Sequence, residues 1–139
     1  MIAYVDTSAL LRHVLQEPGR LEELRSGDAL VSSELLAVEA LRTIDRLRHQ
    51  GALSLQEATA RGEVLAEWLE AVDLVLLRRP ILARASEPFP CPLGTLDALH
   101  LATALVWRDR SSQQDLVIAT HDRDLALAAR AFGFEVRGA

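Results

Sequence analysis

Residues 2–11 read IAYVDTSALL, and this stretch sets the pattern for the rest of the chain. The run at residues 2–5 is short, apolar and rich in β-branched and aromatic side chains, which predicts a strand buried on both faces. Thr7 or Ser8 can then cap a helix that continues to about Leu15. A buried strand that leads directly into a helix is the first half of an α/β unit.

The same alternation of strand and helix continues to the C-terminus. Further strands are predicted at residues 29–32, 72–77, 116–120 and 134–137. Helices are predicted at residues 20–25, 33–50, 54–71, 80–86, 96–107 and 123–132, with a turn at Gly27–Asp28 and a polar loop at 109–115. The helix starts are marked by Ser33, by the capping box of Ser54 and Glu57, and by Thr95. This order predicts an α/β domain whose mostly parallel central sheet of four to five strands is flanked by helices.

Length and composition predict one globular domain that spans residues 1–139. Cys91 is the only cysteine, which excludes a disulfide within the chain and a zinc site built from cysteines. The N-terminus carries no basic targeting region and no apolar run is long enough to cross a bilayer, so we expect a cytoplasmic protein without membrane contact. The net charge of −5 argues against a nucleic-acid binder that relies on bulk positive charge.

Carboxylates occur in four segments where apolar neighbours should discourage them. They are Asp6 in YVDTS, Glu39 in SELLAVE, Asp97 in TLDALH, and Asp122 with Asp124 in THDRD. Because ligands of parallel sheets bind beyond the carboxyl ends of the strands, Asp6 and Asp122 are expected at the same edge. Carboxylates that converge repel each other until a cation, protons or arginines relieve them, and all-oxygen sites suit Mg²⁺ or Mn²⁺.

Each of these positions also has a purely structural interpretation. Asp6 can cap the first helix, and Asp97 can interact with the dipole of its own helix. Glu39 can pair with Arg42, and either Asp122 or Asp124 can be only a helix cap. The order of the four segments along an α/β chain, and not any one of them, favours a catalytic site. The four histidines show no zinc-binding spacing, and His100 is expected to be a packed or surface residue.

The chain resembles the PIN-domain nucleases, and within them the VapC toxins of bacterial toxin–antitoxin pairs. YVDTSALL is similar to the first-strand motif, SSELLAVEALR to the second motif, TLDALHLATAL to the third and most specific, and IATHDRDLALAARAFG to the last. The resemblance covers nearly the whole chain and implies a PIN-like three-layer fold, although the stretch between Arg48 and Leu93 carries no motif of the family. His121 stands where the family often has a tyrosine or a similar residue.

The resemblance implies a Mg²⁺-dependent endoribonuclease in which Mn²⁺ substitutes for Mg²⁺. Asp6 and Asp97 are then the metal ligands, and Glu39 and Asp122 complete the catalytic set. The implied accessory residues are Asp124, Thr7, Ser8 and Thr120, and the arginines near the motifs that could contact phosphate are Arg12, Arg42, Arg46 and Arg123. The implied partners are an RNA substrate, a small antitoxin and a second copy of the chain.

Other functions remain open or are disfavoured on the residues present. Receiver domains and haloacid-dehalogenase-like phosphatases also place an aspartate after the first strand, but both bind the phosphoryl group with a lysine, and this chain has none. A PIN-domain nuclease that processes RNA without a toxin role stays open. A catalytically inactive PIN-type binding module is disfavoured by the intact acidic set.

Overall fold

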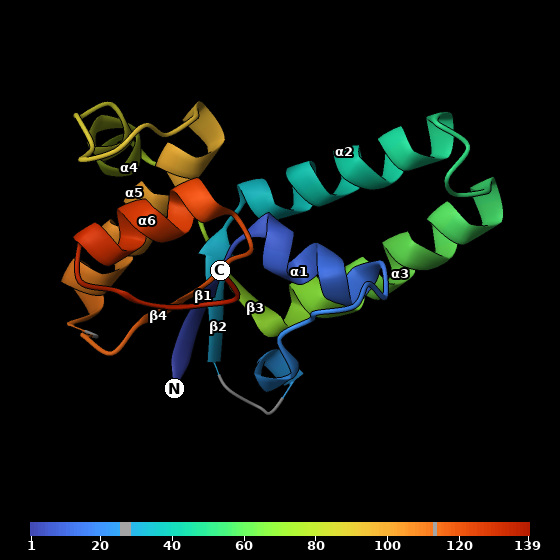
Figure 1. Ribbon diagram of the computed structural model, residues 1–139, viewed down its shortest axis with the longest axis horizontal. Helices are drawn as coiled ribbons and strands as arrows, with labels where there is room; N and C mark the ends of the chain where they lie inside the picture. The colour runs from blue at the N-terminus through green and yellow to red at the C-terminus, as the bar shows by residue number, and fades with distance from the viewer. Residues whose placement is uncertain (26–28, 113) are drawn as a thin grey trace.

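The computed structural model describes residues 1–25, 29–112 and 114–139, so the turn expected at Gly27–Asp28 lies outside the described residues. The five strands are β1 (Ile2–Val5), β2 (Ala29–Ser33), β3 (Val72–Val75), β4 (Val117–Ala119) and β5 (Glu135–Arg137). The helices are α1 (Thr7–Val14), α2 (Leu35–His49), α3 (Leu55–Ala71), α4 (Arg79–Ala85), α5 (Thr95–Ser111) and α6 (Arg123–Ala131), and a 3₁₀ turn, η1, covers Glu22–Arg25. The predicted strands and helices are therefore all present, the helix predicted at 20–25 as the 3₁₀ turn η1, and the bounds of most of them differ at the ends (Figure 1).

All five strands run parallel in the order β3-β2-β1-β4-β5. The chain builds the sheet from β1 outward to β3 and then returns to the other side of β1 to add β4 and β5. The strand order therefore reverses between the adjacent strands β1 and β4, and open α/β sheets bind ligands at the carboxyl ends of the strands at such a point. Asp6 follows β1 and Thr120 follows β4, so both predicted segments come to this point.

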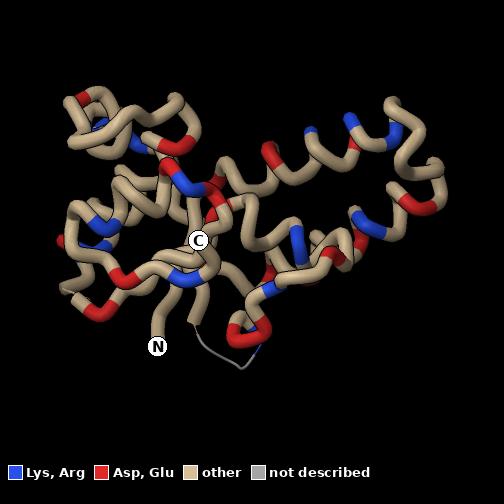
Figure 2. Tube along the Cα trace, in the orientation of Figure 1, with Lys and Arg blue, Asp and Glu red and all other residues tan. Residues whose placement is uncertain are grey.

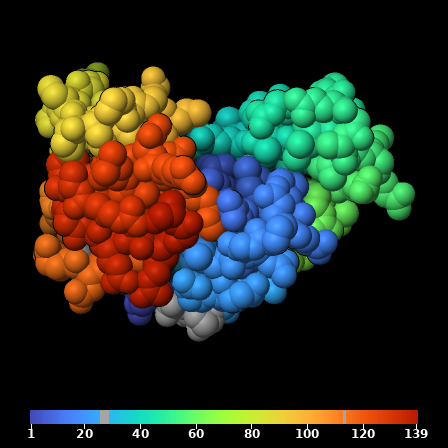
Figure 3. All heavy atoms as spheres, viewed as in Figure 1, coloured from blue at the N-terminus to red at the C-terminus, as the bar shows by residue number. Residues whose placement is uncertain are grey.

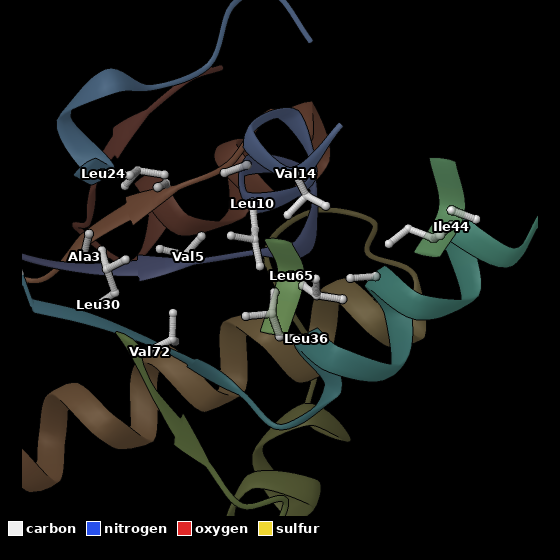
Figure 4. Packing of buried hydrophobic residues seen from close by; sticks show 14 residues of the cluster. Ala3, Val5, Leu10, Val14, Leu24, Leu30, Leu36, Ile44, Leu65 and Val72 are labelled. Atoms are coloured by element: carbon white, nitrogen blue, oxygen red, sulfur yellow. The ribbon is translucent and has the colours of Figure 1, made fainter. Parts of the chain in front are cut away.

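Alternating residues of the strands pack into two separate hydrophobic cores, one on each face of the sheet. Ala3, Val5 and Leu30 face α1, α2 and α3, and Figure 4 shows Leu10, Leu36 and Leu65 gathered in this layer. Tyr4, Val31 and Ile118 instead pack with side chains of α5 and α6, such as Leu101 and Leu125. The result is the three-layer arrangement of helices, sheet and helices that continuous apolar strands require. The ends of α2 and α3 extend away from the rest of the molecule (Figures 1 and 3).

Three of the predicted helix caps differ from the structure. Asp6, and not Thr7 or Ser8, caps α1, because its side chain accepts a hydrogen bond from the backbone N–H of Ala9. The cap position of α2 is Glu34, although the hydroxyl of Ser33 still accepts from the N–H of Leu35 at 3.1 Å. Gly94 occupies the cap position of α5, and Thr95 is already helical. The capping box of Ser54 and Glu57 is confirmed at the start of α3.

Two predicted ends also differ from the structure by two or more residues. α5 continues to Ser111, so the first part of the polar loop predicted at 109–115 is helical. β3 ends at Val75 and not at residue 77, because its pairing with β2 ends where Ser33 lies opposite Val75. Among the described residues, no helix is long and apolar enough to cross a membrane.

Candidate active site

Asp6 is held in one orientation by four other groups at the carboxyl end of β1. Its backbone N–H donates to the carbonyl of Ala119 at 3.1 Å, which extends the pairing of β1 with β4. Its Oδ1 accepts from the hydroxyl of Ser8 at 2.7 Å and from the N–H of Ala9 at 2.9 Å, and its Oδ2 accepts from the hydroxyl of Thr120 at 2.5 Å. Burial raises the pKa of Asp6, and these hydrogen bonds act in the opposite direction. The helix-cap interpretation is thus correct for Asp6, but it accounts for only one of these bonds.

The segment after β4 is tied to the same point. The hydroxyl of Thr120 also accepts from the N–H of Asp122 at 3.0 Å, and the hydroxyl of Ser8 accepts from the N–H of His121 at 2.9 Å. Asp122 caps α6, because its Oδ1 accepts from the N–H of Leu125 at 2.9 Å. Ser8 and Thr120 therefore bind the acidic segment of β1 to the acidic segment of β4.

Glu39 reaches the site from the middle of α2. Its Oε1 accepts hydrogen bonds from the hydroxyl of Thr7 at 2.9 Å and from Nε2 of His100 at 2.6 Å. Burial acts to raise the pKa of Glu39, but the hydrogen bond and charge of His100 and the hydrogen bond of Thr7 hold it below its usual value. The alternative pairing with Arg42 is wrong, since Arg42 pairs with Asp45 at 3.3 Å.

Glu34, the other glutamate of the second motif, has a structural contact instead. Its Oε1 accepts from the backbone N–H of Leu77 at 2.9 Å, just after β3. This bond joins the start of α2 to the segment after the edge strand β3.

Asp97 is the carboxylate whose charge is least compensated. It lies half-buried in the first turn of α5, and in the described part of the chain no hydrogen bond reaches its side chain. Burial, together with repulsion from Asp122, Asp6 and Glu39, raises the pKa of Asp97 to about 6. This repulsion means that the other three predicted carboxylates, Asp6, Glu39 and Asp122, lie within electrostatic range of Asp97. In Figure 2, acidic segments from separate parts of the chain gather near the start of α6.

The remaining predicted residues lie around this cluster or outside it. Asp124 is exposed in the first turn of α6, one residue beyond the exposed Arg123. Arg12 donates to the carbonyl of Pro18 at 3.4 Å, beyond the far end of α1. Arg46 is exposed on α2, one turn beyond Arg42. Of the four predicted arginines, Arg123 is the one that directly follows a predicted acidic residue, Asp122.

His100 is the residue that sequence reasoning missed. It is buried, but it is more than a packing residue, because it hydrogen-bonds Glu39 through Nε2 and the hydroxyl of Tyr4 through Nδ1 at 2.7 Å. The spacing of Asp97 and His100 could have indicated this, since residues three apart lie on one face of a helix.

The side chains in this cluster fit a hard divalent cation by their chemistry, since they offer carboxylate and hydroxyl oxygens. Within residues 1–25, 29–112 and 114–139, no three side chains of His, Cys, Asp or Glu are grouped so that they could hold a metal ion as they stand. The unrelieved repulsion at Asp97 is the feature that a cation would remove.

Comparison with known proteins agrees with this architecture. Residues 3–131 match the family model described as PIN domain. Ribonuclease VapC47 of Mycobacterium tuberculosis (strain CDC 1551 / Oshkosh) is 30% identical over 94% of this chain and 92% of its own length. Ribonuclease VapC46 of Mycobacterium tuberculosis (strain ATCC 25618 / H37Rv) is 28% identical over 96% of this chain and 94% of its own length.

Two solved structures share the fold at low sequence identity. VapBC2 from Rickettsia felis matches with a TM-score of 0.66 and 11% identity over 99% of this chain and 98% of the matched chain. VapBC-1 from nontypeable Haemophilus influenzae matches with a TM-score of 0.61 and 18% identity, over 99% of this chain and 97% of the matched chain. On the family match and the identity to two VapC ribonucleases, this chain belongs to the PIN-domain family.

Proposed function

We propose that the protein is a Mg²⁺-dependent endoribonuclease and the toxin of a VapBC-type toxin–antitoxin pair. The observation that carries this proposal is the meeting of four carboxylates from four elements beyond β1 and β4, with the pKa of Asp97 raised to about 6. An acidic cluster of this kind attracts a divalent cation to the place where parallel sheets bind ligands. The relatives named ribonucleases and the VapBC structures support the choice of substrate and partner.

In this proposal Asp6 and Asp97 hold the cation, with Mn²⁺ able to replace Mg²⁺, and Glu39 and Asp122 complete the catalytic set. A bound cation would lower the pKa of its water and stabilise charge on the phosphoryl oxygens. Thr120 and Ser8 fix the two oxygens of Asp6, so its orientation is set before any ligand arrives. Arg123 is exposed next to Asp122, where it can contact a phosphate of the RNA.

The test of this function is cleavage of RNA by the purified chain, with Mg²⁺, with Mn²⁺ and with a chelator. We expect cleavage only with the cations, and products that carry a 5′-phosphate and a 3′-hydroxyl. Cation binding without cleavage of any RNA would favour the binding module. A reading frame for a small antitoxin next to this gene would distinguish a toxin from an RNA-processing nuclease.

Asp122 is expected to matter more to cleavage than Asp124. Both sit at the start of α6, but Asp124 is exposed, whereas Asp122 is half-buried and its charge raises the pKa of Asp97. Because Asp122 also caps α6, the variant to use is Asp122→Asn, which keeps the cap. We expect kcat to fall about fivefold, on the order of 1 kcal/mol of electrostatic stabilisation. Asp124→Asn is the matched variant, and loss of activity there with a silent Asp122→Asn would assign the role to the other carboxylate.

The proposed partners are a second copy of the chain and an antitoxin whose tail lies across the acidic cluster. Exposed apolar side chains stand beside the acidic residues, with Val38 and Leu41 near Glu39 and Leu96 next to Asp97. Such surface suits an amphipathic partner helix. A basic side chain of the tail would enter the negative field of the site and replace the cation.

We therefore expect alanine at that basic residue to weaken inhibition of cleavage, measured by titrating antitoxin into the cleavage reaction. Full inhibition by a tail without any basic residue would contradict this mode of inhibition. Light scattering at micromolar concentration tests the homodimer separately.

A further inference from the structure

Hydrogen bonds link Tyr4 of β1 to His100 and His100 to Glu39. The proposed function gives no role to Tyr4 or His100. The hydroxyl of Tyr4 lies 2.7 Å from Nδ1 of His100, and Nε2 of the same ring lies 2.6 Å from Oε1 of Glu39. Tyr4 and His100 are both almost fully buried, with 1% and 2% of their surface exposed. These hydrogen bonds therefore join β1, α5 and α2 beneath the acidic cluster.

The direction of these bonds follows from Glu39. A carboxylate oxygen only accepts, so Nε2 of His100, which lies 2.6 Å from Oε1, carries a proton and donates it. In the neutral ring Nδ1 then has no proton, and it accepts from the hydroxyl of Tyr4 at 2.7 Å. The hydroxyls of Ser32 and Thr103 donate elsewhere, to the carbonyl of Val5 at 2.5 Å and to the carbonyl of Leu99 at 2.6 Å.

Both donors to Glu39 use the same oxygen. Thr7 and His100 bond Oε1, at 2.9 Å and 2.6 Å. Over the described residues, no hydrogen bond reaches Oε2. One oxygen of the carboxylate is thus fixed to the protein, and the other is left to accept from water, cation or substrate.

We propose that His100 is a positioning residue: through Nε2–H it fixes Oε1 of Glu39 and orients Oε2 toward the acidic cluster, and Tyr4 fixes the tautomer that this requires. This inference rests on the proposed function. Hydrogen bonds from a second layer of residues orient acidic groups around a cation, and their loss costs about 10- to 100-fold in metal affinity or activity.

The experiment compares two buried histidines of the same chain. His13 is also 2% exposed, and its Nε2 contacts the carbonyl of Leu21 at 2.9 Å, at the other end of α1 from Asp6. His100→Leu removes the donor to Glu39, His100→Gln keeps an amide donor, and His13→Leu is the matched loss of a buried ring elsewhere. Mn²⁺ binding is measured by titration calorimetry, kcat and KM are measured on RNA, and unfolding in urea reports stability.

We expect His100→Leu to weaken Mn²⁺ binding or lower kcat by about 10- to 100-fold, with KM for RNA within about threefold. His100→Gln should recover part of that loss. His13→Leu should lower the stability but leave Mn²⁺ affinity and kcat within about threefold. In a Glu39→Gln background, His100→Leu should have little further effect on either quantity, because the two residues act as a unit.

Several results would overturn the inference while the proposed function stands. One is an active wild-type protein in which His100→Leu behaves like His13→Leu. Another is full additivity of the His100 and Glu39 variants. Nitrogen-15 NMR of the wild-type imidazoles provides a test that needs no variant, since it should show the proton of neutral His100 on Nε2, and a proton found on Nδ1 would contradict the assignment. A wild-type protein that neither binds Mn²⁺ nor cleaves RNA would instead refute the proposed function, and the positioning role with it.

Discussion

Asp97→Asn is expected to abolish RNA cleavage while the fold stays intact. The variant keeps the shape of the side chain and removes the charge that the proposed cation needs. Since a cation contributes several kcal/mol to the transition state, the loss of kcat should be at least about a hundredfold. In the described part of the chain, Asp97 accepts no hydrogen bond, so the substitution breaks none. The measurement is cleavage of a labelled RNA with Mg²⁺ in excess, beside a circular-dichroism spectrum of the variant.

Asp6→Asn is expected to be equally inactive, but the substitution changes hydrogen bonds of the protein as well as the charge. Asp6 accepts from Ser8, from the N–H of Ala9 and from Thr120, and an amide offers an acceptor at only one of its two positions. The substitution therefore changes the link between β1 and β4 as well as the charge. An inactive Asp6 variant alone would not separate these effects, whereas the pair of variants does.

Asp73→Asn serves as the control for charge. Asp73 is an exposed aspartate on the edge strand β3, outside the acidic cluster. Its substitution changes the net charge by the same amount and should leave cleavage within about twofold, in keeping with a screened surface charge. Cleavage by Asp97→Asn at the rate of Asp73→Asn would remove Asp97 from the site.

The strands were predictable because their signal is local. Residues 2–5 form a continuous apolar run, and β1 has these bounds because both of its faces are covered by helices. β3 was predicted too long for a physical reason. Leu76 continues the apolar pattern, but the strand ends at Val75 with its pairing to β2, and Leu76 is 49% exposed. An edge strand has one neighbour only, so its length depends on that neighbour's length.

The helix starts were less predictable, because Asp6, Thr7 and Ser8 are all residue types that cap helices. Sequence alone cannot choose between three adjacent candidates. In the structure Asp6 is the first residue after β1, so its extended backbone serves both as the strand end and as the cap of α1. Thr7 and Ser8 are then free to bond Glu39 and Asp6.

A general rule of parallel sheets predicted that Asp6 and Asp122 lie at one edge of the sheet. No such rule predicted the hydrogen bond between His100 and Glu39. The rule places the ends of β1 and β4 at one edge, but it says nothing of the strand order β3-β2-β1-β4-β5 that makes them neighbours. The bond between Glu39 and His100 joins residues 61 positions apart. Such a contact depends on how α2 and α5 pack on opposite faces of the sheet, and no local pattern encodes it.

The raised pKa of Asp97 also makes the stability of the protein depend on pH in a predictable direction. The folded protein binds the proton with a pKa of about 6, and the usual value of this carboxyl is 3.8. The folded state thus holds the proton more tightly than the unfolded state, so Asp97 lowers the stability as pH rises from about 4 through 6. Each pKa unit corresponds to about 1.4 kcal/mol, and solvent screening reduces this for a half-buried group. Above pH 6 the charge of Asp97 therefore lowers the free energy of unfolding by about 2 kcal/mol.

Asp97→Asn should therefore stabilise the protein in metal-free buffer at pH 7 to 8, although it removes a group from the proposed site. The helix dipole of α5 favours a negative charge in its first turn by about 0.3–1 kcal/mol, and the variant loses this interaction. The free energy of unfolding should therefore increase by about 1–2 kcal/mol. The gain should shrink as pH falls through 6 and vanish near pH 4, where wild-type Asp97 is protonated. Urea unfolding with a chelator at several pH values measures this, with Asp73→Asn as the control. Added Mg²⁺ should stabilise the wild-type protein more than Asp97→Asn, because the cation and the substitution relieve the same repulsion. A gain that persists unchanged at pH 4 would show that its cause is not the charge of Asp97.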